Sequence, residues 1–463
     1  MPARARFGAF PLDDGKVDFR VWAPNSSSVA VRLVPGTVPG TCLAPAGDGI
    51  HEGVIETPAG DDYLYVLDGD RAFPDPCSRF QPTGIRGPSR VVDTSRYEIA
   101  PGPDLAPEDL VLYELHVGTF SDEGTFHGVV PHLPALTKLG VTAVELMPVA
   151  TFPGSRGWGY DMLYPYAVHP AYGGPDGLAR LVDAAHLEGL AVILDVVYNH
   201  LGPGAEAITA FGPYVTERRE TPWGGAIDYS EPAVREWAMQ NAELWVHDFK
   251  VDGLRLDATF AIFDDDSPKH ILAELRGRLP GTLLIAEQEG NFRPIQEWGF
   301  DAQSADGFHH ELHVALTGEQ HGHYARHGSL ASLAAEYERT PTERLVYCSQ
   351  NHDQVGNRTA GDRPQPAELE LRAAALLFSD AAPVHGRGVR RATSVPVLHG
   401  PRRSGHRRGY APGAPPRLRL RGPGRPRPTG PADVRTLEAL ARGAARPARA
   451  LRRPAAPAPH AVA

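Results

Sequence analysis

The 463-residue sequence predicts an α/β protein in which a (β/α)8 TIM barrel, with its eighth strand lost, follows a small β-sandwich domain. Three observations carry this prediction. Residues 1–95 contain short segments of alternating polarity; from Val111 onward apolar segments alternate with amphipathic helical patterns; and polar clusters follow four of those apolar segments. We therefore divide the chain into residues 1–95, a barrel domain at 96–383 and a tail at 384–463.

In the N-terminal region apolar and polar residues alternate within Val17–Trp22, Ser28–Leu33 and Tyr63–Leu67, and Gly, Pro and Asp lie between these segments. A period of two is typical of strands that bury one face. The pattern favours a sandwich of the early-set or carbohydrate-module kind. The segment Pro101-Gly-Pro-Asp104 is expected to link it to the barrel.

Seven later segments have the length and composition of buried strands. They are Val111–His116, Ala143–Met147, Ala191–Asp195, Val251–Leu256, Leu283–Ala286, a weak segment near Phe300–Ala302, and Leu345–Ser349. Amphipathic patterns between them, such as the one after Ser230-Glu-Pro232, predict helices that lie outside a parallel barrel. An unusually long loop, residues 201–229, is where we expect substrate specificity to be built.

Polar residues gather after four of these strands, in Asp195-Val-Val-Tyr-Asn-His200, Arg255-Leu-Asp257, Glu287 and Asn351-His352-Asp353. A single carboxylate at a strand end is more often a helix cap or turn residue than a catalyst. Four such clusters, each at the end of a predicted strand, favour a catalytic role, because the carboxyl ends of barrel strands converge on one face. We therefore expect them to form one active site.

The carboxylates of these clusters indicate glycoside hydrolysis. Asp257 and Glu287 follow adjacent strands, which can bring them to the ~5–5.5 Å separation of retaining glycosidases. Arg255 lies two residues before Asp257 on the same strand, so both side chains point to the same side and the guanidinium can keep the carboxylate ionised. Asp353 is expected to supply a third carboxylate.

In this order the four clusters resemble the motifs of the α-amylase family, glycoside hydrolase family 13. Within it, Gly157-Trp-Gly-Tyr-Asp161, Ala171-Tyr-Gly-Gly174 and Gln350-Asn-His-Asp-Gln-Val-Gly-Asn-Arg358 resemble the malto-oligosyltrehalose trehalohydrolases. The resemblance implies that Asp257 is the nucleophile, Glu287 the general acid/base and Asp353 the transition-state stabiliser. It also implies a group of substrate-binding residues: Tyr160, Asp195, His200, Arg255 and His352.

The reaction implied by the resemblance is hydrolysis of the α-1,4 bond that joins a malto-oligosaccharide to a terminal trehalose, with water as acceptor and no cofactor. A malto-oligosyltrehalose synthase is the implied pathway neighbour. We expect no metal: many amylases hold calcium with the Asn of the first motif and a His after the nucleophile, and here Asn199 is present but Ala261 takes the second place. Phe260 and Asp306-Gly307 are further departures from the family pattern.

Composition limits the cellular location and the metal or disulfide sites that we expect. No apolar stretch approaches the ~18 residues of a membrane span, and the N-terminus lacks the apolar core of a signal peptide, so we expect a cytoplasmic protein. Three scattered cysteines do not favour a disulfide framework or zinc. Six histidines between His309 and His327 resemble a metal cluster, but the glycines among them weaken a continuous helix and favour coincidence.

The tail at 384–463 differs from the rest of the chain. It holds 18 of the 46 basic residues but only two of the 56 acidic ones, so the body is strongly acidic, which favours a neutral sugar over nucleic acid. Such an Arg- and Pro-rich segment cannot build a core and predicts disorder. A one-base shift of a plausible coding sequence turns Val384-His-Gly-Arg-Gly-Val389 into Phe-Met-Gly-Glu-Glu, so we expect an out-of-frame tail.

Two rival functions remain open. A 1,4-α-glucan branching enzyme, or another α-amylase-family enzyme, would share the same carboxylates. A truncated remnant without activity is the alternative of another class, because a barrel without its last strand would expose two sheet edges.

Overall fold

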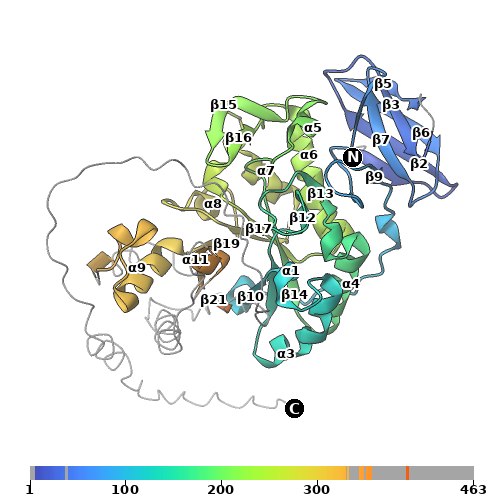
Figure 1. Cartoon of the computed structure of the whole chain (residues 1–463). Coiled ribbons are helices and arrows are strands. Elements are labelled where there is room, and N and C mark those ends of the chain that lie inside the picture. Colours follow the sequence, from blue (N-terminus) through green and yellow to red (C-terminus); the bar gives the residue numbers. More distant parts are fainter. Residues whose placement is uncertain are drawn as a thin grey trace, which may run out of the picture.

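The computed structural model describes residues 6–36, 40–329, 331–332, 344–348, 351–356 and 393–395, and a parallel β-barrel lies at its centre (Figure 1). The barrel strands are β10 (Val111–Leu115), β11 (Ala143–Leu146), β14 (Ala191–Val196), β17 (Gly253–Leu256), β18 (Leu283–Ala286), β19 (Ala302–Ser304), β20 (Leu345–Cys348) and β21 (Thr393–Val395). The first seven agree with the seven segments predicted from the sequence.

The prediction that the eighth strand is lost is wrong for the described residues. β21 pairs in parallel with β20 on one side and with β10 on the other, which closes the barrel. Two of its three residues, Thr393 and Val395, are β-branched and suit a strand, although the composition around them does not. The expected disorder and frame shift of 384–463 otherwise fall outside the described residues.

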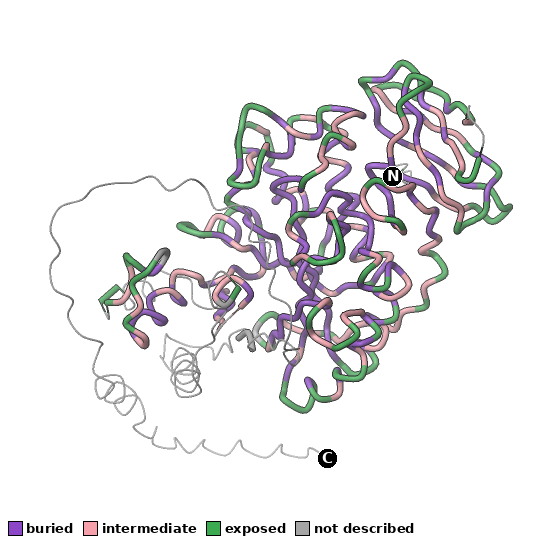
Figure 2. Tube along the Cα trace, in the orientation of Figure 1, coloured by how far each residue is buried: buried purple, intermediate pink, exposed green. Residues whose placement is uncertain are grey.

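Helices connect the strands and lie outside the barrel, as the alternating pattern predicts (Figure 1). They are α1 (Val117–Phe120), α2 (Phe126–Val129), α3 (Leu133–Lys138), α4 (Gly174–Leu187), α5 (Glu206–Thr209), α6 (Pro232–Glu243), α7 (Ile271–Arg278), α8 (Arg293–Gln296), α9 (Asp306–Thr317) and α11 (His352–Gly356). The apolar positions of α4, including Leu178, Leu181 and Val182, are buried against the strands. In Figure 2 the trace through the barrel strands is mostly coloured as buried.

The N-terminal region forms two antiparallel sheets. One has the order β1 (Gly8–Pro11), β2 (Lys16–Trp22), β6 (Ile50–Glu56), β5 (Ala44–Gly47); the other contains β4 (Thr41–Cys42), β3 (Val29–Val34), β7 (Asp62–Leu67), β8 (Arg71–Phe73) and β9 (Ser89–Arg90). Phe19 of the first sheet meets Tyr63 and Tyr65 of the second edge to face, at ring distances of 5.0 and 6.5 Å. Aromatic side chains therefore join the sheets.

The long loop after β14 contains α5 and a hairpin of β15 (Val215–Thr221) and β16 (Gly224–Ile227). Its base packs on the N-terminal sheets: Tyr65 lies 6.0 Å from Phe211, and Trp22 lies 5.3 Å from Tyr214, in edge-to-face contacts. The N-terminal sheets thus support the loop that borders the catalytic face. A second small hairpin, β12 (Ala150–Thr151) with β13 (Tyr164–Val168), brackets Tyr160.

Candidate active site

The eight residues singled out in the sequence come together at the carboxyl ends of the barrel strands. Asp195 and Arg255 lie on β14 and β17, Asp257 and Glu287 follow β17 and β18 directly, and His352 begins α11 after β20. Tyr160, His200 and Asp353 complete the set. Hydrogen bonds and ion pairs, some of them through Asn199, connect all eight into one network.

The guanidinium of Arg255 is the centre of this network. Its Nη1 donates to Oδ2 of Asp195 at 2.6 Å and to Oδ1 of Asp257 at 3.2 Å, and its Nη2 lies 2.8 Å from Oε2 of Glu287. All four side chains are mostly buried. One cation therefore holds three carboxylates of adjacent strands within contact of a single planar group.

The surroundings of Asp257 act strongly on its charge. Burial raises the pKa of the Asp257 carboxyl well above its ordinary range, and Glu287 adds to this effect against the opposing charge of Arg255. The hydrogen bond from Asn199 acts in the same direction as Arg255 and favours the carboxylate form of Asp257.

Hydrogen-bond donors surround both of these carboxyl groups. Both oxygens of Asp257 accept, Oδ1 from Arg255 and Oδ2 from the side-chain amide of Asn199 at 2.9 Å. At Glu287, the backbone N–H of Ala258 donates to Oε2, and Nη2 of Arg255 contacts the same oxygen. Donors therefore hold both oxygens of Asp257 and one oxygen of Glu287.

A second branch of the network leads from Asp195 to His352. The hydroxyl of Tyr160 donates to Oδ2 of Asp195 at 2.6 Å and lies 2.8 Å from Nε2 of His352, whose ring stacks on the tyrosine at 5.0 Å. Burial opposes a charge on His352, but Asp353 and Glu114 overcome it and raise the pKa of the imidazole to about 10. His352 is therefore a cation at neutral pH, and its Nε2 lies 3.5 Å from Asp353.

His200 is neutral, because burial lowers its pKa to about 4. Its Nδ1–H donates to the amide oxygen of Asn199, so that the amide nitrogen is directed to Asp257. The indole of Trp223, at the tip of the β15–β16 hairpin, stacks on the imidazole at 5.2 Å and remains about half exposed. Asn199, considered from the sequence as a calcium ligand, here donates to Asp257.

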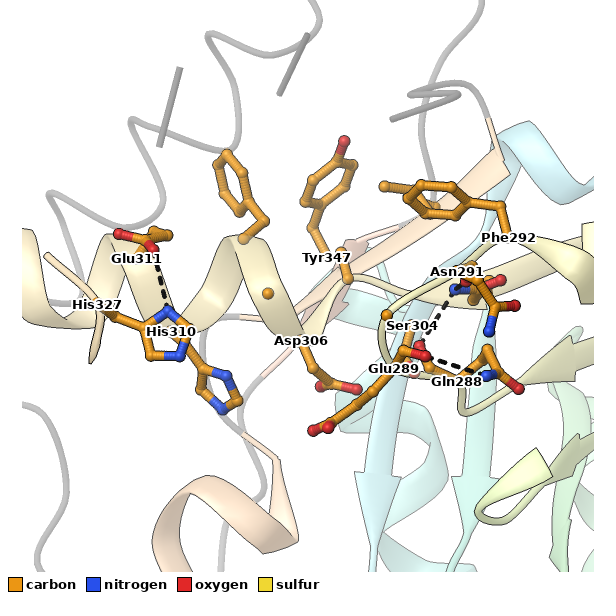
Figure 3. A pocket seen from close by; sticks show the side chains of 16 residues that line it. Gln288, Glu289, Asn291, Phe292, Ser304, Asp306, His310, Glu311, His327 and Tyr347 are labelled. Carbon is orange, nitrogen blue, oxygen red and sulfur yellow. Dashed lines mark hydrogen bonds and ion pairs between the residues drawn. The ribbon is translucent and has the colours of Figure 1, made fainter. Parts of the chain in front are cut away.

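A hollow of about 270 Å³ adjoins Glu287 on the side of β18 and β19 (Figure 3). Its lining begins immediately after Glu287 and includes Gln288, Glu289, Gln303, Asp306, His310 and Tyr347. In Figure 3, the side chains of Glu289 and Asp306 point toward one another across it. The buried Oε1 of Gln303 accepts no hydrogen bond from the described residues.

The histidines between 309 and 327 do not form a metal site in the described part of the chain, where no group of three or more potential ligands converges. His309, His310 and His313 lie on α9, which ends at Gly318 with a positive φ of 69°. His313 and His327 pair instead with Glu319 and Glu311. Within the same described ranges, no helix has the length and apolarity needed to cross a membrane.

Two buried acids of the barrel were missed from the sequence. Glu114 on β10 and Glu145 on β11 are opposite each other in the parallel register, and both are buried. Burial, reinforced by Glu114, raises the pKa of Glu145 to about 8. Each of them could have been noticed as the one charged residue in an otherwise apolar strand segment, Val111-Leu-Tyr-Glu-Leu115 or Ala143-Val-Glu-Leu146. A protein core tolerates such a charge only when the charged group has a partner.

Comparisons with known proteins agree with this geometry. A family model of the alpha amylase catalytic domain matches residues 80–215. A crystal structure from Salmonella typhimurium, provisionally assigned as an alpha amylase, superposes with a TM-score of 0.76 at 33% identity and covers 84% of this chain and 72% of that one.

Two curated relatives are more specific. The malto-oligosyltrehalose trehalohydrolase of Deinococcus radiodurans is 42% identical over 431 residues, which cover 85% of this chain and 71% of the relative. The enzyme of the same name from Saccharolobus solfataricus is 39% identical over 399 residues, with 76% and 69% covered. With this identity over more than two thirds of their length, the chain belongs to the malto-oligosyltrehalose trehalohydrolase family of α-amylase-type glycosidases.

Proposed function

We propose that this protein is a retaining glycoside hydrolase that cleaves the α-1,4 bond next to the terminal trehalose of malto-oligosyltrehalose and releases trehalose. The observation that carries the proposal is the shared contact of Asp257 and Glu287 with the guanidinium of Arg255. A nucleophile and an acid held by one planar cation are close enough for the two-step, retaining mechanism.

In the first step Oδ of Asp257 attacks the anomeric carbon while Glu287 transfers its proton to the glycosidic oxygen. The C–O bond to trehalose breaks, and trehalose leaves as the neutral alcohol. A glycosyl ester on Asp257 remains. In the second step the Glu287 carboxylate takes a proton from water, the water oxygen attacks the anomeric carbon, and Asp257 is released as carboxylate.

The remaining residues hold the glucose that is cleaved. Oδ1 of Asp195 is buried and accepts no hydrogen bond from the described residues, so it suits a sugar hydroxyl. His352, as a cation, and the neutral His200 offer further hydrogen bonds, and Tyr160 presents its ring as a stacking surface. Asp353, about two-fifths exposed, faces the positive charge that develops on the sugar in the transition state.

The hollow beside Glu287 suits the leaving trehalose. A leaving group departs on the side of the acid that protonates it, and the hollow is lined by residues that directly follow Glu287. Polar groups converge there, among them Glu289, Asp306 and the unpartnered oxygen of Gln303, as recognition of sugar hydroxyls requires.

Incubation with malto-oligosyltrehalose tests the proposal. Trehalose and a shortened malto-oligosaccharide are the expected products, with an α-configured new reducing end. New α-1,6 branches in a longer glucan, without trehalose, would instead identify a branching enzyme. Equal, negligible hydrolysis by the wild type and by Asp257→Asn would identify an inactive remnant.

We also propose the domain division given above, with the two N-terminal sheets as a β-sandwich at 1–95 and the barrel domain beginning at 96, but with the barrel extended beyond the predicted limit of 383 to include β21. Cytoplasmic location, no nucleic-acid or membrane partner, and supply of the substrate by a malto-oligosyltrehalose synthase are part of the same proposal. Intact mass of the protein from its source tests the frame shift, since an in-frame enzyme would be longer.

A further inference from the structure

Glu114 makes a long-range contact with two hydrogen bonds at the mouth of the barrel. Its carboxylate accepts two hydrogen bonds from His352, one from the backbone N–H to Oε2 at 2.8 Å and one from Nδ1 to Oε1 at 2.6 Å. The two residues are 238 positions apart, and both side chains are about nineteen-twentieths buried. A bidentate contact fixes both the position and the ring orientation of His352.

The place of this contact in the barrel gives it a second consequence. β10, which carries Glu114, and β20, which leads to His352, are not neighbours, since β21 lies between them. Among the described residues, the pairing of β10 with β21 reaches Tyr113 and Val395, one residue before Glu114. The Glu114–His352 contact therefore joins β10 to the segment after β20, next to the last described residue of β21.

We propose that Glu114 is a positioning residue of the hydrolysis: it fixes His352, and with it Asp353 and the Tyr160–Asp195 hydrogen bond, across the end of the short strand β21. Glu114 is not expected to touch the substrate. The inference rests on the proposed function, because it assigns Glu114 a share in that reaction.

The positive charge of His352, which Glu114 stabilises, decides which groups donate in the hydrogen bonds around its ring. With both nitrogens of His352 protonated, Nδ1–H donates to Glu114 and Nε2–H donates to the oxygen of Tyr160. The hydroxyl hydrogen of Tyr160 is thereby committed to Asp195. A neutral imidazole would retain only one ring N–H, and the hydroxyl of Tyr160 could then turn toward Nε2 instead.

Several titratable groups face this contact from the surrounding elements. Glu145 lies beside Glu114 on β11, and burial raises its pKa to about 8, which favours its neutral form at pH 7. Asp353, 3.5 Å from Nε2, is the second carboxylate that faces the imidazole of His352. Other charged or titratable groups of the barrel mouth include Tyr160, Asp195, His200, Arg255, Asp257, Glu287 and Asp306. None of these residues is substituted in the variants used below.

The first measurement compares Glu114→Gln with the wild type. The amide replaces one acceptor oxygen by a donor, so one of the two contacts with His352 becomes donor against donor. We expect kcat for trehalose release to fall about 10²-fold, the scale for misplacing a catalytic group by roughly 1 Å, with a smaller change in KM. Glu236→Gln is the matched control, because Glu236 accepts from Arg278 on the outer helices, far from the mouth.

The second measurement requires no substrate. Imidazole resonances of histidine-labelled protein are followed against pH, and His352 is assigned by its absence from His352→Ala. Loss of the carboxylate partner should lower the pKa of His352 by about 1 to 3 in Glu114→Gln and leave it unchanged in Glu236→Gln. This titration decides the role of Glu114 even if the wild type releases no trehalose, an outcome that would overturn the proposed function alone.

The third measurement separates positioning from general stability. If Glu114 acts through His352, Glu114→Gln should reduce kcat less than about 10-fold in the His352→Ala background, against about 10²-fold in the wild type. Equal losses in both backgrounds, or an unchanged pKa of His352, would overturn the proposal.

If Glu114→Gln melts below the assay temperature, Glu114→Asp replaces it. This variant keeps the charge but withdraws the carboxylate by one methylene, so kcat should still fall. An unchanged kcat would contradict a positioning role.

Discussion

Arg255 and Asp257 are two residues apart at the end of β17, and Nη1 of the arginine lies 3.2 Å from Oδ1 of the aspartate. The same guanidinium also contacts Asp195 and Glu287. A single cationic side chain therefore opposes the charge of three buried carboxylates, and Arg255 and Asp257 should respond very differently to substitution.

Replacing Asp257 by Asn should abolish hydrolysis while leaving the fold at least as stable. Loss of the nucleophile is expected to lower kcat by about 10⁴-fold or more. The folded state raises the pKa of Asp257, so the ionised carboxylate costs stability at pH 7 and the neutral amide removes that cost. Steady-state trehalose release and thermal melting test both parts. Asp248→Asn, outside the mouth, is the control; a clearly lower melting temperature for Asp257→Asn would contradict the charge argument.

Replacing Arg255 by Met should instead destabilise the protein. The substitution leaves Asp195, Asp257 and Glu287 buried without their shared cation, which typically costs about 3–5 kcal/mol. Denaturant unfolding measures this loss. Arg71→Met, which breaks the half-exposed pair with Asp68, should cost no more than about 1 kcal/mol. Similar losses for the two variants would show that Arg255 is not the centre of the network.

The contact of Arg255 with Asp257 was predictable from the sequence because it is local. Side chains two residues apart on a strand share a face, and the ends of barrel strands share an edge. The same two rules bring Asp195 and Glu287 to the site. Residues of this kind are positioned by secondary structure and by strand order, both of which the pattern of apolar residues predicts.

Glu114 and β21 were not predictable in this way. The partner of Glu114 is 238 residues away, and no local pattern indicates which side chains meet across a barrel. The strand Thr393–Val395 is only three residues long and lies within an Arg- and Pro-rich segment, so composition outweighed its weak signal. The pairing of this segment with β10 and β20 stabilises it as a strand, although its local sequence gives only a weak strand preference.

Trp223 should contribute to substrate binding. Its indole is about half exposed and stacks on His200 at the edge of the site, where a sugar ring can lie against it. We expect Trp223→Ala to raise KM about 2- to 10-fold, with little change in melting temperature, since stacking of an aromatic ring contributes about 0.5–1.5 kcal/mol. An unchanged KM together with a lower melting temperature would assign Trp223 to the packing of the hairpin instead.

Asp306 should make the stability of the protein depend on pH. Burial, together with the charges of Glu287 and Asp353, raises its pKa to about 7, whereas an unfolded chain has an ordinary value near 3.8. The folded state therefore binds this proton more tightly, and the resulting stability is full below about pH 4 and is lost as the pH rises through about 7. Asn cannot ionise, so Asp306→Asn should flatten that part of the curve and melt at a higher temperature than the wild type at pH 8.

Melting temperatures of both proteins between pH 4 and 8 measure the effect, and Asp265→Asn, an exposed partner of Arg293, should follow the wild-type curve. Parallel curves for Asp306→Asn and the wild type would mean that Asp306 is ionised in the folded protein throughout this range, in which case the hollow beside Glu287 would present a permanent negative charge to the leaving sugar.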